Sequence, residues 1–439
     1  MSKTVAMIAK QIRHRDLTAV QSVEDCLARI ATRNSEINAF TSITAERARR
    51  RAVEIDTRIA RGEDVGPLAG VPFAAKDLFD IAGITTIAGS KILAANPPAK
   101  ADAAAIAMLE RAGAILVGAL NMEELAYGFL TDNAHYGRTA NPVDPARTAG
   151  GSSGGSGAAV AAGMVPLALG SDTNGSIRIP AAFCGAVGFK PTYGRIDRTG
   201  MTLLAPSQDH VGWVGSCVSD VASAWSVSSP RQTTPSPAHE PVIGVADGYF
   251  QELLSDDVRA ALAEVSALFD AKRSVTIPEP DVARAAAYAI TSSEASSLRM
   301  NDLKNRPQDF DPATRDRFLA GALLPAHWYI KAKCFRAWFQ KQIATLFREV
   351  DVILMPANPF PAPRFGEEEI ALDGKIHPVR PTIGRFTQPI SPLGLPILCL
   401  PVARSGQLPI GMQLIAPPDS EAMLLKLGET LEKRLSQRS

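Results

Sequence analysis

A run of glycine and serine is the part of the sequence best suited to hold a reacting group. Residues 150–157 read GGSSGGSG, an apolar Ala/Val stretch follows, and a polar turn, DTNGS, occupies residues 172–176. Glycines let backbone N–H groups converge on one point, and serines supply hydroxyls at the same place. A flexible linker is the alternative, but a linker is not followed directly by an apolar segment and a second turn. We therefore predict that this run forms the floor of an active site.

Lys76 is a second candidate for chemistry. It ends a short apolar run, VPFAA at residues 71–75, which is typical of a buried strand. Lysine is seldom buried unless it is paired or used, and pairing with Asp77 or Asp80 at the surface is the alternative. A serine hydroxyl needs an adjacent base to act as a nucleophile near neutral pH. Lysine can be that base only if burial lowers its pKa well below its reference value of about 10.4.

Taken together, these stretches resemble the amidase signature family, a large group of serine amidases. Residues 150–191 match the long signature of that family without a gap, and residues 68–83 (LAGVPFAAKDLFDIAG) resemble its lysine motif. Residues 388–396 (QPISPLGLP) and 408–413 (LPIGMQ) resemble its closing motifs. The resemblance spans nearly the whole chain. It implies an α/β fold, an α/β/α arrangement in which helices flank one large mixed sheet.

The resemblance also implies a catalytic triad. Ser176 corresponds to the acylated nucleophile, Ser152 to a bridging serine that follows a cis peptide bond, and Lys76 to the base. The two serines are 24 residues apart (176 − 152), which is the separation found in the family. The chemistry is consistent, because Ser152 can accept the proton of Ser176 while it passes its own to Lys76.

The turn at Thr173, Asn174, Gly175 and Ser176 is expected to form the oxyanion hole. Its backbone N–H groups would stabilise the developing negative charge, and one such donor is typically worth about 3 kcal/mol. The family usually has glycine where this chain has Asn174. Asparagine tolerates left-handed backbone angles better than most residues, so the turn can survive the change. A direct contact between Asn174 and the substrate is left open.

Three further residues are candidates for substrate binding. Arg178 lies two residues after Ser176, and its guanidinium group could bind a substrate carboxylate. Equally, it could hold the sheet or a carboxylate of the loop. Tyr127 and Gly128 lie shortly before the Gly/Ser run, where they line a pocket or belong to a surface loop.

The sequence lacks the motifs of other enzyme classes, or has them without the elements that they require. The pattern GxSxG occurs twice within residues 150–155, but no hydrophobic strand precedes it, as the α/β-hydrolase fold requires. No phosphate-binding GxxxxGK[ST] occurs, and no HExxH or cluster of histidines. We therefore expect no cofactor and no metal.

The composition excludes other kinds of protein. Of the 439 residues, 46% are hydrophobic and 21% are charged, which permits a sizeable core and argues against disorder. A formal net charge of +1 gives no sign of nucleic-acid or membrane binding. The five cysteines are scattered, so we expect no disulfide framework and a reducing cytoplasm as the setting. The N-terminus carries too many charges for a signal peptide.

We expect residues 1–439 to form a single domain of the amidase signature type. Within it, residues 1–65 are predicted to be helical, with Asp16 capping the first long helix, and residues 68–220 form the catalytic core. Residues 256–350 have mostly helical patterns and cover one side of the sheet, whereas 351–439 supply closing strands and a final helix. A stretch rich in Ser, Pro and Thr at residues 228–242 indicates a surface loop or linker.

Finer details suggest a substrate. Residues 126–129 (AYGF), 132–137 (DNAHYG) and 379–389 (VRPTIGRFTQP) resemble the carboxybiuret hydrolases within the family. This implies hydrolysis of a small, carboxylate-bearing, urea-like amide with release of ammonia. It also implies a homodimer, to which a small helical partner subunit can be added. The alternatives are a broader amidase, a chain like the amidase component of the glutamyl-tRNA amidotransferases, or a scaffold with little activity.

Overall fold

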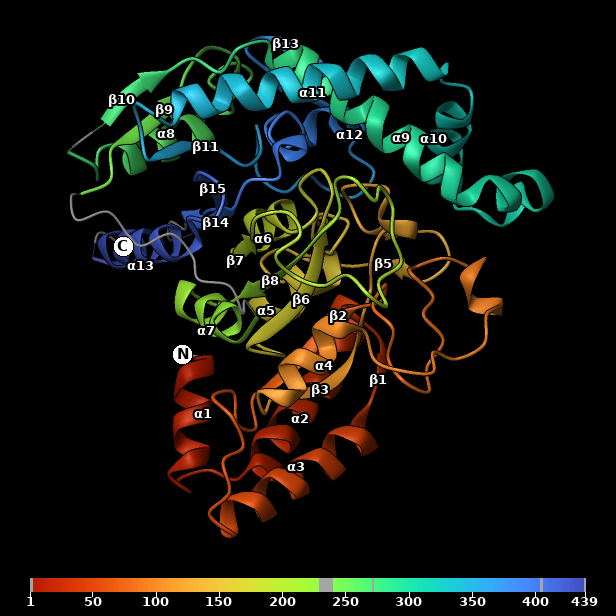
Figure 1. The fold of residues 1–439 in the computed structure, drawn as a ribbon, viewed down its shortest axis with the longest axis vertical. Helices are drawn as coiled ribbons and strands as arrows, with labels where there is room; N and C mark the ends of the chain where they lie inside the picture. Colours follow the sequence, from red (N-terminus) through yellow and green to blue (C-terminus); the bar gives the residue numbers. More distant parts are fainter. Residues whose placement is uncertain (1–2, 229–239, 271, 403–405, 438–439) are drawn as a thin grey trace.

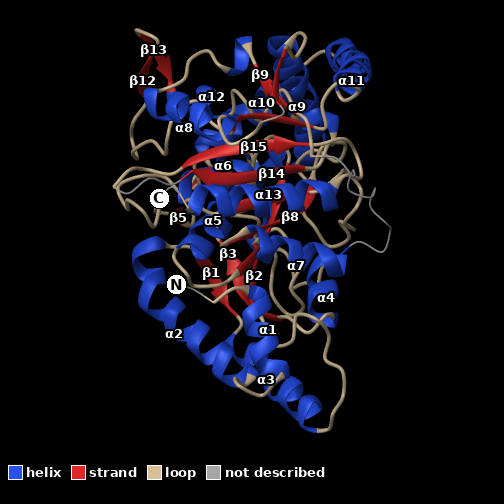
Figure 2. Ribbon diagram, turned by 90° about the vertical axis from the view of Figure 1, so that its left-hand side faces the viewer, coloured by secondary structure: helices blue, strands red, loops and turns tan. Residues whose placement is uncertain are grey.

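Eleven strands of the described residues form one large sheet, and most of them are short apolar runs of the sequence (Figures 1 and 2). The computed structural model describes residues 3–228, 240–270, 272–402 and 406–437. The order of strands across the sheet is β1 (Phe40–Ile43), β3 (Ile115–Leu120), β2 (Pro72–Lys76), β6 (Leu167–Asp172), β8 (His210–Gly215), β7 (Val187–Lys190), β14 (Ile397–Val402), β15 (Ile410–Ile415), β11 (Val352–Pro356), β9 (Ile243–Ala246) and β10 (Lys272–Val275).

The sheet is mixed, and its pairing decides where the polar ends of the strands meet. β2 lies parallel to both β3 and β6, and β9 lies parallel to both β10 and β11, whereas the strands between β6 and β11 pair antiparallel. Parallel strands are buried on both faces, which explains the uninterrupted apolar sequence of β2. Because parallel strands end at the same edge, Lys76 at the end of β2 lies beside the polar end of β6.

Thirteen α-helices and two small hairpins complete the described structure. The hairpins pair β4 (Asp132–Asn133) with β5 (Gly137–Arg138) and β12 (Glu369–Leu372) with β13 (Lys375–Pro378). The helices are α1 (Val5–Arg13), α2 (Ala19–Ile37), α3 (Ala45–Ala60), α4 (Ala104–Arg111), α5 (Gly154–Ala161), α6 (Arg178–Cys184), α7 (Val218–Ser228), α8 (Asp256–Ser266), α9 (Pro280–Asn305), α10 (Pro312–Ala322), α11 (Ala326–Leu346), α12 (Val379–Ile383) and α13 (Glu421–Ser436).

Helices cover both faces of the sheet. In β7, a side chain at Gly188 would meet Ala181 of α6, whereas the neighbouring Phe189 packs against Trp225 of α7. Successive residues of a strand point to opposite faces, so α6 and α7 lie on opposite sides. α5 lies beside α6, and α13 lies beside α7. The predicted fold class, an α/β/α arrangement around a large mixed sheet, is confirmed.

The region between residues 256 and 350 forms a helical layer of its own. It contains α8 to α11 together with the edge strand β10, and α9 contacts both α10 and α11. Figure 1 shows α9 to α11 at one end of the molecule, with α1 to α3 at the other. Residues of α9 line the same cavity as residues 173, 174 and 176, so segments far apart in the sequence share it.

Two details near the N-terminus differ from the expectation. Asp16 is not the cap of α2; the cap is Thr18, whose side chain accepts from Gln21 N while the Gln21 side chain accepts from Thr18 N. This reciprocal pair satisfies two backbone donors, which one aspartate two residues earlier cannot do. The predicted helical region also contains a strand, β1.

The predicted loop at residues 228–242 lies mostly outside the described residues. No described helix has the length and apolar character to span a membrane.

Candidate active site

Lys76 is buried against the hydroxyl groups of two serines. Its Nζ donates hydrogen bonds to Ser152 Oγ at 2.7 Å and to Ser171 Oγ at 2.9 Å, and the whole residue is buried. Burial lowers the pKa of Lys76 to about 7, because the charged form loses its hydration; the carboxylates of Asp172, Asp209 and Glu123 act in the opposite direction. The neutral amine is therefore accessible near neutral pH, as a general base requires.

The segment around Ser152 brings the Gly/Ser run against the second turn. The peptide bond between Gly151 and Ser152 is cis. One residue further, the N–H of Ser153 donates to the backbone carbonyl of Ser176 at 3.2 Å. The helix α5 then begins at Gly154, and its glycines allow close packing: a side chain at Gly155 would lie 2.5 Å from the carbonyl oxygen of Asn121. Ser152, which contacts Lys76, is therefore the chain neighbour of the residue that is hydrogen-bonded to Ser176.

The turn that carries Ser176 joins β6 to α6 and is organised by Asp172. The two carboxylate oxygens of Asp172 accept from the N–H groups of Gly175 at 2.8 Å and Ile177 at 3.1 Å. Burial alone would raise the pKa of the Asp172 carboxyl, but Arg178 and Lys190 outweigh it and hold this pKa below its usual range. Asp172 is therefore a permanent anion that fixes the backbone around the nucleophile.

The same contacts correct the predicted oxyanion hole at one position. Gly175 uses its N–H for Asp172, so this amide is not a free donor. In the part of the chain that the structure describes, the N–H groups of Thr173, Asn174 and Ser176 have no acceptor. Those three amides stay candidates for an oxyanion. The sequence pattern could not distinguish these three amides from that of Gly175, because the acceptor of the Gly175 N–H is the side chain of Asp172, the last residue of β6.

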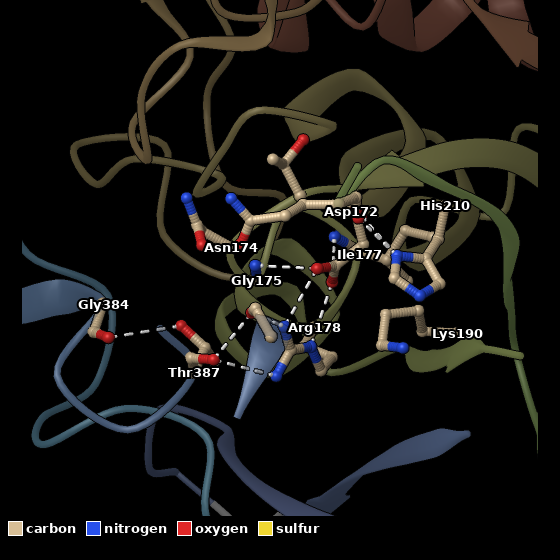
Figure 3. Close-up of polar contacts among 12 residues, drawn as sticks. Asp172, Asn174, Gly175, Ile177, Arg178, Lys190, His210, Gly384 and Thr387 are labelled. Carbon is tan, nitrogen blue, oxygen red and sulfur yellow. Dashed lines mark hydrogen bonds and ion pairs between the residues drawn. The ribbon is translucent and has the colours of Figure 1, made fainter. Parts of the chain in front are cut away.

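Arg178 does not lie where the predicted carboxylate contact requires. Its side chain is fully buried and donates to both oxygens of Asp172 at 2.9 and 3.0 Å (Figure 3). It also donates to Gln413 and Ser391, each at 2.7 Å. It is not among the residues that line the cavity at Ser176. The prediction that Arg178 binds substrate is therefore wrong, and the alternative, an arginine that holds a loop carboxylate, agrees with the contacts.

Asn174 also differs from the expectation for its backbone. The left-handed residue of the turn is Gly175, with φ = 127°, whereas Asn174 does not have a positive φ. The tolerance of asparagine for left-handed angles therefore does not explain why it stands here. Its side-chain Nδ2 donates to Thr291 Oγ1 of α9 at 2.8 Å.

A cavity of about 700 Å³ opens at the turn. Ser176, Thr173 and Asn174 line it, and so do both other predicted contact residues, Tyr127 and Gly128. The hydroxyl of Tyr127 lies 2.7 Å from Ser292 Oγ, which ties this loop to α9. The remaining lining residues, from the helical layer, two nearby loops and the C-terminal part, are Ala126, Phe129, Leu204, Asp281, Arg284, Ala285, Tyr288, Ala289, Thr291, Arg317, Leu324, Trp328, Arg380, Pro381 and Gln388.

Three arginines give this cavity a positive character that the sequence analysis missed. Arg284, Arg317 and Arg380 come from α9, α10 and α12, and the only carboxylate among the described lining residues is Asp281. Arg284 donates to Gln388 Oε1 at 2.9 Å, and Arg317 donates to the carbonyl of Tyr127 at 2.7 Å. Arg380 lies in the quoted stretch 379–389, but nothing in the sequence brings it together with Arg284 and Arg317, because only tertiary packing places the three helices at the turn.

Ser171 is a second residue that the sequence analysis missed. It contacts Lys76 as closely as Ser152 does, although it belongs to β6 rather than to the Gly/Ser run. A signal existed: Ser171 and Asp172 are polar residues at the end of an otherwise buried apolar strand.

The structure places the Lys76–Ser152 contact near the turn that carries Ser176, and comparisons with known proteins show the family to which the chain belongs. The family described as Amidase matches residues 21–425, and the chain belongs to this amidase signature family of hydrolases. It is similar to AtzE of Pseudomonas sp. (strain ADP), a 1-carboxybiuret hydrolase subunit, with 45% identity over 98% of both chains. It is also 34% identical to the GatA-type component of the glutamyl-tRNA(Gln) amidotransferase of Carboxydothermus hydrogenoformans, over 97% of this chain and 96% of the relative.

Solved structures show the same fold. The chain matches a structure described as "An unexpected vestigial protein complex reveals the evolutionary origins of an s-triazine catabolic enzyme" with a TM-score of 0.95 and 44% identity, over 98% of both chains. A bacterial aryl acylamidase of the amidase signature family has a TM-score of 0.88 at 23% identity, covering 99% of this chain and 97% of that one, and supports the fold alone.

Proposed function

We propose that this chain hydrolyses the terminal amide of a small, urea-like substrate that bears a carboxylate, with 1-carboxybiuret as the best candidate. The observation that carries the proposal is that a buried lysine–serine contact and a cavity lined by arginines both lie near the turn of Ser176. Lys76 contacts Ser152, the chain neighbour of Ser153, which is hydrogen-bonded to the Ser176 carbonyl, and the cavity that Ser176 lines is also lined by three arginines. The relative AtzE, 45% identical, is a 1-carboxybiuret hydrolase subunit.

The proposed reaction uses the three side chains of the triad that the family resemblance implies. Ser176 Oγ attacks the carbonyl carbon while its proton passes to Ser152 and the proton of Ser152 passes to neutral Lys76. The amides of Thr173, Asn174 and Ser176 stabilise the oxyanion. The C–N bond then breaks, and the leaving nitrogen takes a proton back from Lys76 through Ser152 and departs as ammonia. Water cleaves the ester of Ser176 by the same relay and restores the hydroxyl.

The triad itself is tested by substitution. Ser176→Ala and Lys76→Ala are each expected to lower kcat by a factor on the order of 10⁴ to 10⁶, since the members of such a unit act together. Ser152→Ala is expected to be impaired with a trace of activity. A fluorophosphonate probe should label the wild type at Ser176 and leave Ser176→Ala unlabelled. Near-normal turnover by Ser176→Ala would disprove the mechanism.

Arg380 is the best placed of the three arginines to bind the substrate carboxylate. Arg284 and Arg317 are already engaged with Gln388 and with the carbonyl of Tyr127. Arg380 has no hydrogen-bond partner in the described part of the chain, and it acts on the buried Glu123 through charge alone. A free guanidinium can form a bidentate contact with a carboxylate, which is strong and directional.

The substrate class is tested with carboxybiuret and biuret, which differ by the carboxylate. The wild type is expected to prefer carboxybiuret in kcat/KM, and Arg380→Gln is expected to lower that preference by about tenfold or more, since hydrogen bonds to charged groups contribute about 1.5–3 kcal/mol. Arg364→Gln is the matched control, because Arg364 is exposed and lines a neighbouring cavity but not this one. Equal rates for both substrates in the wild type would make this a broader amidase.

We also propose that the chain works in a complex with a small helical subunit. AtzE is named as a subunit, and the similar solved structure is described as a protein complex. On this chain, Leu323 is 82% exposed, and Trp328 and Ile330 of α11 are more than half exposed. Such apolar surface is typical of protein interfaces. Light scattering on the chain alone, and after co-expression with a candidate partner, tests this; a stable homodimer that covers these residues would argue for self-association instead.

A cytoplasmic setting is part of the same proposal. All five cysteines are free thiols, and Cys26, Cys184 and Cys399 are buried without a disulfide partner. Proteins of oxidising compartments commonly use paired cysteines, so this pattern favours a reducing compartment. Localisation of a tagged chain in its host tests it, and recovery from an oxidising compartment would contradict it.

A further inference from the structure

The side chain of Asn174 is held in place by α9. It is 7% exposed, lines the cavity two residues before Ser176, and donates through Nδ2 to Thr291 Oγ1 at 2.8 Å. Figure 3 shows this side chain pointing away from the Asp172–Arg178 pair that stabilises the rest of the turn. The Asn174 side chain therefore makes no contact with the polar network that fixes the turn.

The other end of this side chain lacks a partner. Asn174 Oδ1 is buried and accepts no hydrogen bond from the described residues. The Thr291 hydroxyl accepts from Asn174 Nδ2 and, at 3.0 Å, from Gln208 Nε2, but it makes no hydrogen bond to Asn174 Oδ1. A buried acceptor without a donor is destabilising, so it is normally satisfied by a bound molecule or by water. Here the unpaired oxygen belongs to a residue that lines the substrate cavity.

We propose that Asn174 Oδ1 accepts a hydrogen bond from the N–H that flanks the scissile carbonyl of the substrate, and so selects urea-like amides over alkyl amides. The inference rests on the proposed function and deepens it. When the carbonyl oxygen lies at the amides of Thr173, Asn174 and Ser176, the groups beside that carbonyl are the nearest parts of the substrate to the Asn174 side chain. A urea carries an N–H on both sides of its carbonyl, whereas an alkyl amide has a carbon on one side. In an alkyl amide the only N–H groups belong to the nitrogen that leaves. A urea has a further N–H on the nitrogen that stays, and this N–H can donate to Oδ1 throughout the reaction.

The test compares two ligands that differ in this one group. N-carbamoylglycine and succinamate have the same length and the same carboxylate, but N-carbamoylglycine has N–H where succinamate has CH₂ next to the amide carbonyl. Binding is measured by calorimetry in Ser176→Ala, which does not turn either ligand over. We expect Ser176→Ala to bind N-carbamoylglycine at least about tenfold more tightly than succinamate, a typical difference for one buried hydrogen bond.

Further substitutions in the same background assign the preference to one atom. Adding Asn174→Ala is expected to reduce the preference to less than about threefold, mostly through weaker binding of N-carbamoylglycine. Asn174→Asp keeps an acceptor oxygen but has no amide donor, so it should retain the preference. Thr291→Val frees the Asn174 side chain and should lower the preference in part. Gln208→Met is the matched control, because Gln208 shares the Thr291 hydroxyl but does not line the cavity.

The outcomes separate this inference from the proposed function. Equal binding of the two ligands to Ser176→Ala, or a preference that survives Asn174→Ala, overturns the role of Asn174 and leaves the carboxybiuret comparison untouched. A loss of preference in Gln208→Met as large as that in Asn174→Ala also overturns it, since the effect would then be structural. If neither ligand binds, both this inference and the proposal that Arg380 binds the substrate carboxylate are wrong. Melting temperatures of all variants establish that each is folded.

Discussion

At the scale of the single residue, the decisive property of this site is the proton affinity of one amine. Burial lowers the pKa of Lys76 to about 7. Only the neutral amine can accept the proton of Ser152, so activity is gained as the pH rises through this pKa and is lost below it. We predict that kcat/KM rises with pH, with a midpoint near 7, and then levels off. A pH–rate profile with buffers of constant ionic strength measures it; a rate that falls over this range would contradict a lysine base.

The contact between Lys76 and Ser171 provides a second prediction. Ser171 Oγ accepts a hydrogen bond from Nζ, and a hydrogen bond of this kind favours the charged form of the lysine. Ser171→Ala is therefore expected to lower the pKa of Lys76 and to move the midpoint of the pH–rate profile to lower pH. Ser156→Ala is the matched control, because the Ser156 hydroxyl is equally buried but donates to the carbonyl of Leu169. A midpoint that moves upward, or moves equally in the control, would show that Ser171 plays another part.

These residues also show how far sequence reasoning reaches at this scale. Lys76, Ser152 and Ser176 could be proposed because each stands in a motif with a fixed spacing. Ser171 could not be proposed with the same certainty, since its position next to Lys76 depends on the register of β6 against β2. The prediction for Arg178 was wrong for a related reason: proximity in sequence to Ser176 says nothing about which side of the turn the guanidinium occupies.

At the scale of the element, the β6–α6 turn depends on one buried ion pair. Arg178 and Asp172 are both fully buried, and Asp172 also binds the amides of Gly175 and Ile177. Arg178→Ala would leave a buried carboxylate without its counter-charge, and breaking such a pair typically costs about 3–5 kcal/mol. We predict a loss of this size in the free energy of unfolding, measured by urea denaturation. Arg178→Lys is also expected to be destabilising, because lysine cannot form the bidentate contact.

A surface pair supplies the control for this prediction. Arg49 and Glu24 make a similarly close contact, but both side chains are about half exposed. Exposed ion pairs contribute at most about 1 kcal/mol, so Arg49→Ala should change stability little. If Arg178→Ala were as mild as Arg49→Ala, the buried pair would not be what stabilises the turn.

The elements themselves were largely predictable, for physical reasons. Strands such as β11, β14 and β15 are short apolar runs bounded by turn residues, and the helical patterns predicted over residues 256–350 include α11 (Ala326–Leu346). The start of α2 was misplaced, because a single acidic residue is a weaker signal than the reciprocal pair of Thr18 and Gln21.

At the scale of the whole molecule, the cavity is an assembly of segments that no local pattern connects. Its walls come from residues 126–129, from the turn at 173–176, from α9 and α10, and from residues 380–388. The sequence predicted the turn and the first loop. It could not predict the contribution of the helical layer, because the amphipathic pattern of a helix specifies that it packs but not against which part of the sheet.

This architecture predicts that a ligand stabilises the whole chain by holding these segments together. A ligand at one hundred times its Kd adds about 2.7 kcal/mol to the stability of the folded state. For a chain of 439 residues this corresponds to a rise in Tm of about 3 °C. We therefore expect N-carbamoylglycine to raise the Tm of Ser176→Ala by that amount at a hundredfold excess over its Kd. At that same concentration it should raise the Tm much less once Arg380→Gln is added, because the substitution removes the cation that α12 contributes.

The control in this experiment is the exposed arginine at position 364. Arg364→Gln leaves the cavity lining at Ser176 unchanged, so the ligand should still raise the Tm of Ser176→Ala with this substitution by the full amount. A shift that is equally large in the Arg380→Gln and Arg364→Gln proteins would mean that the carboxylate is bound elsewhere. A shift of several degrees caused by sodium chloride at the same ionic strength would mean that the arginines respond to charge in general. Only a ligand-specific rise that depends on Arg380 agrees with a cavity in which α12 supplies the cation that binds the substrate carboxylate.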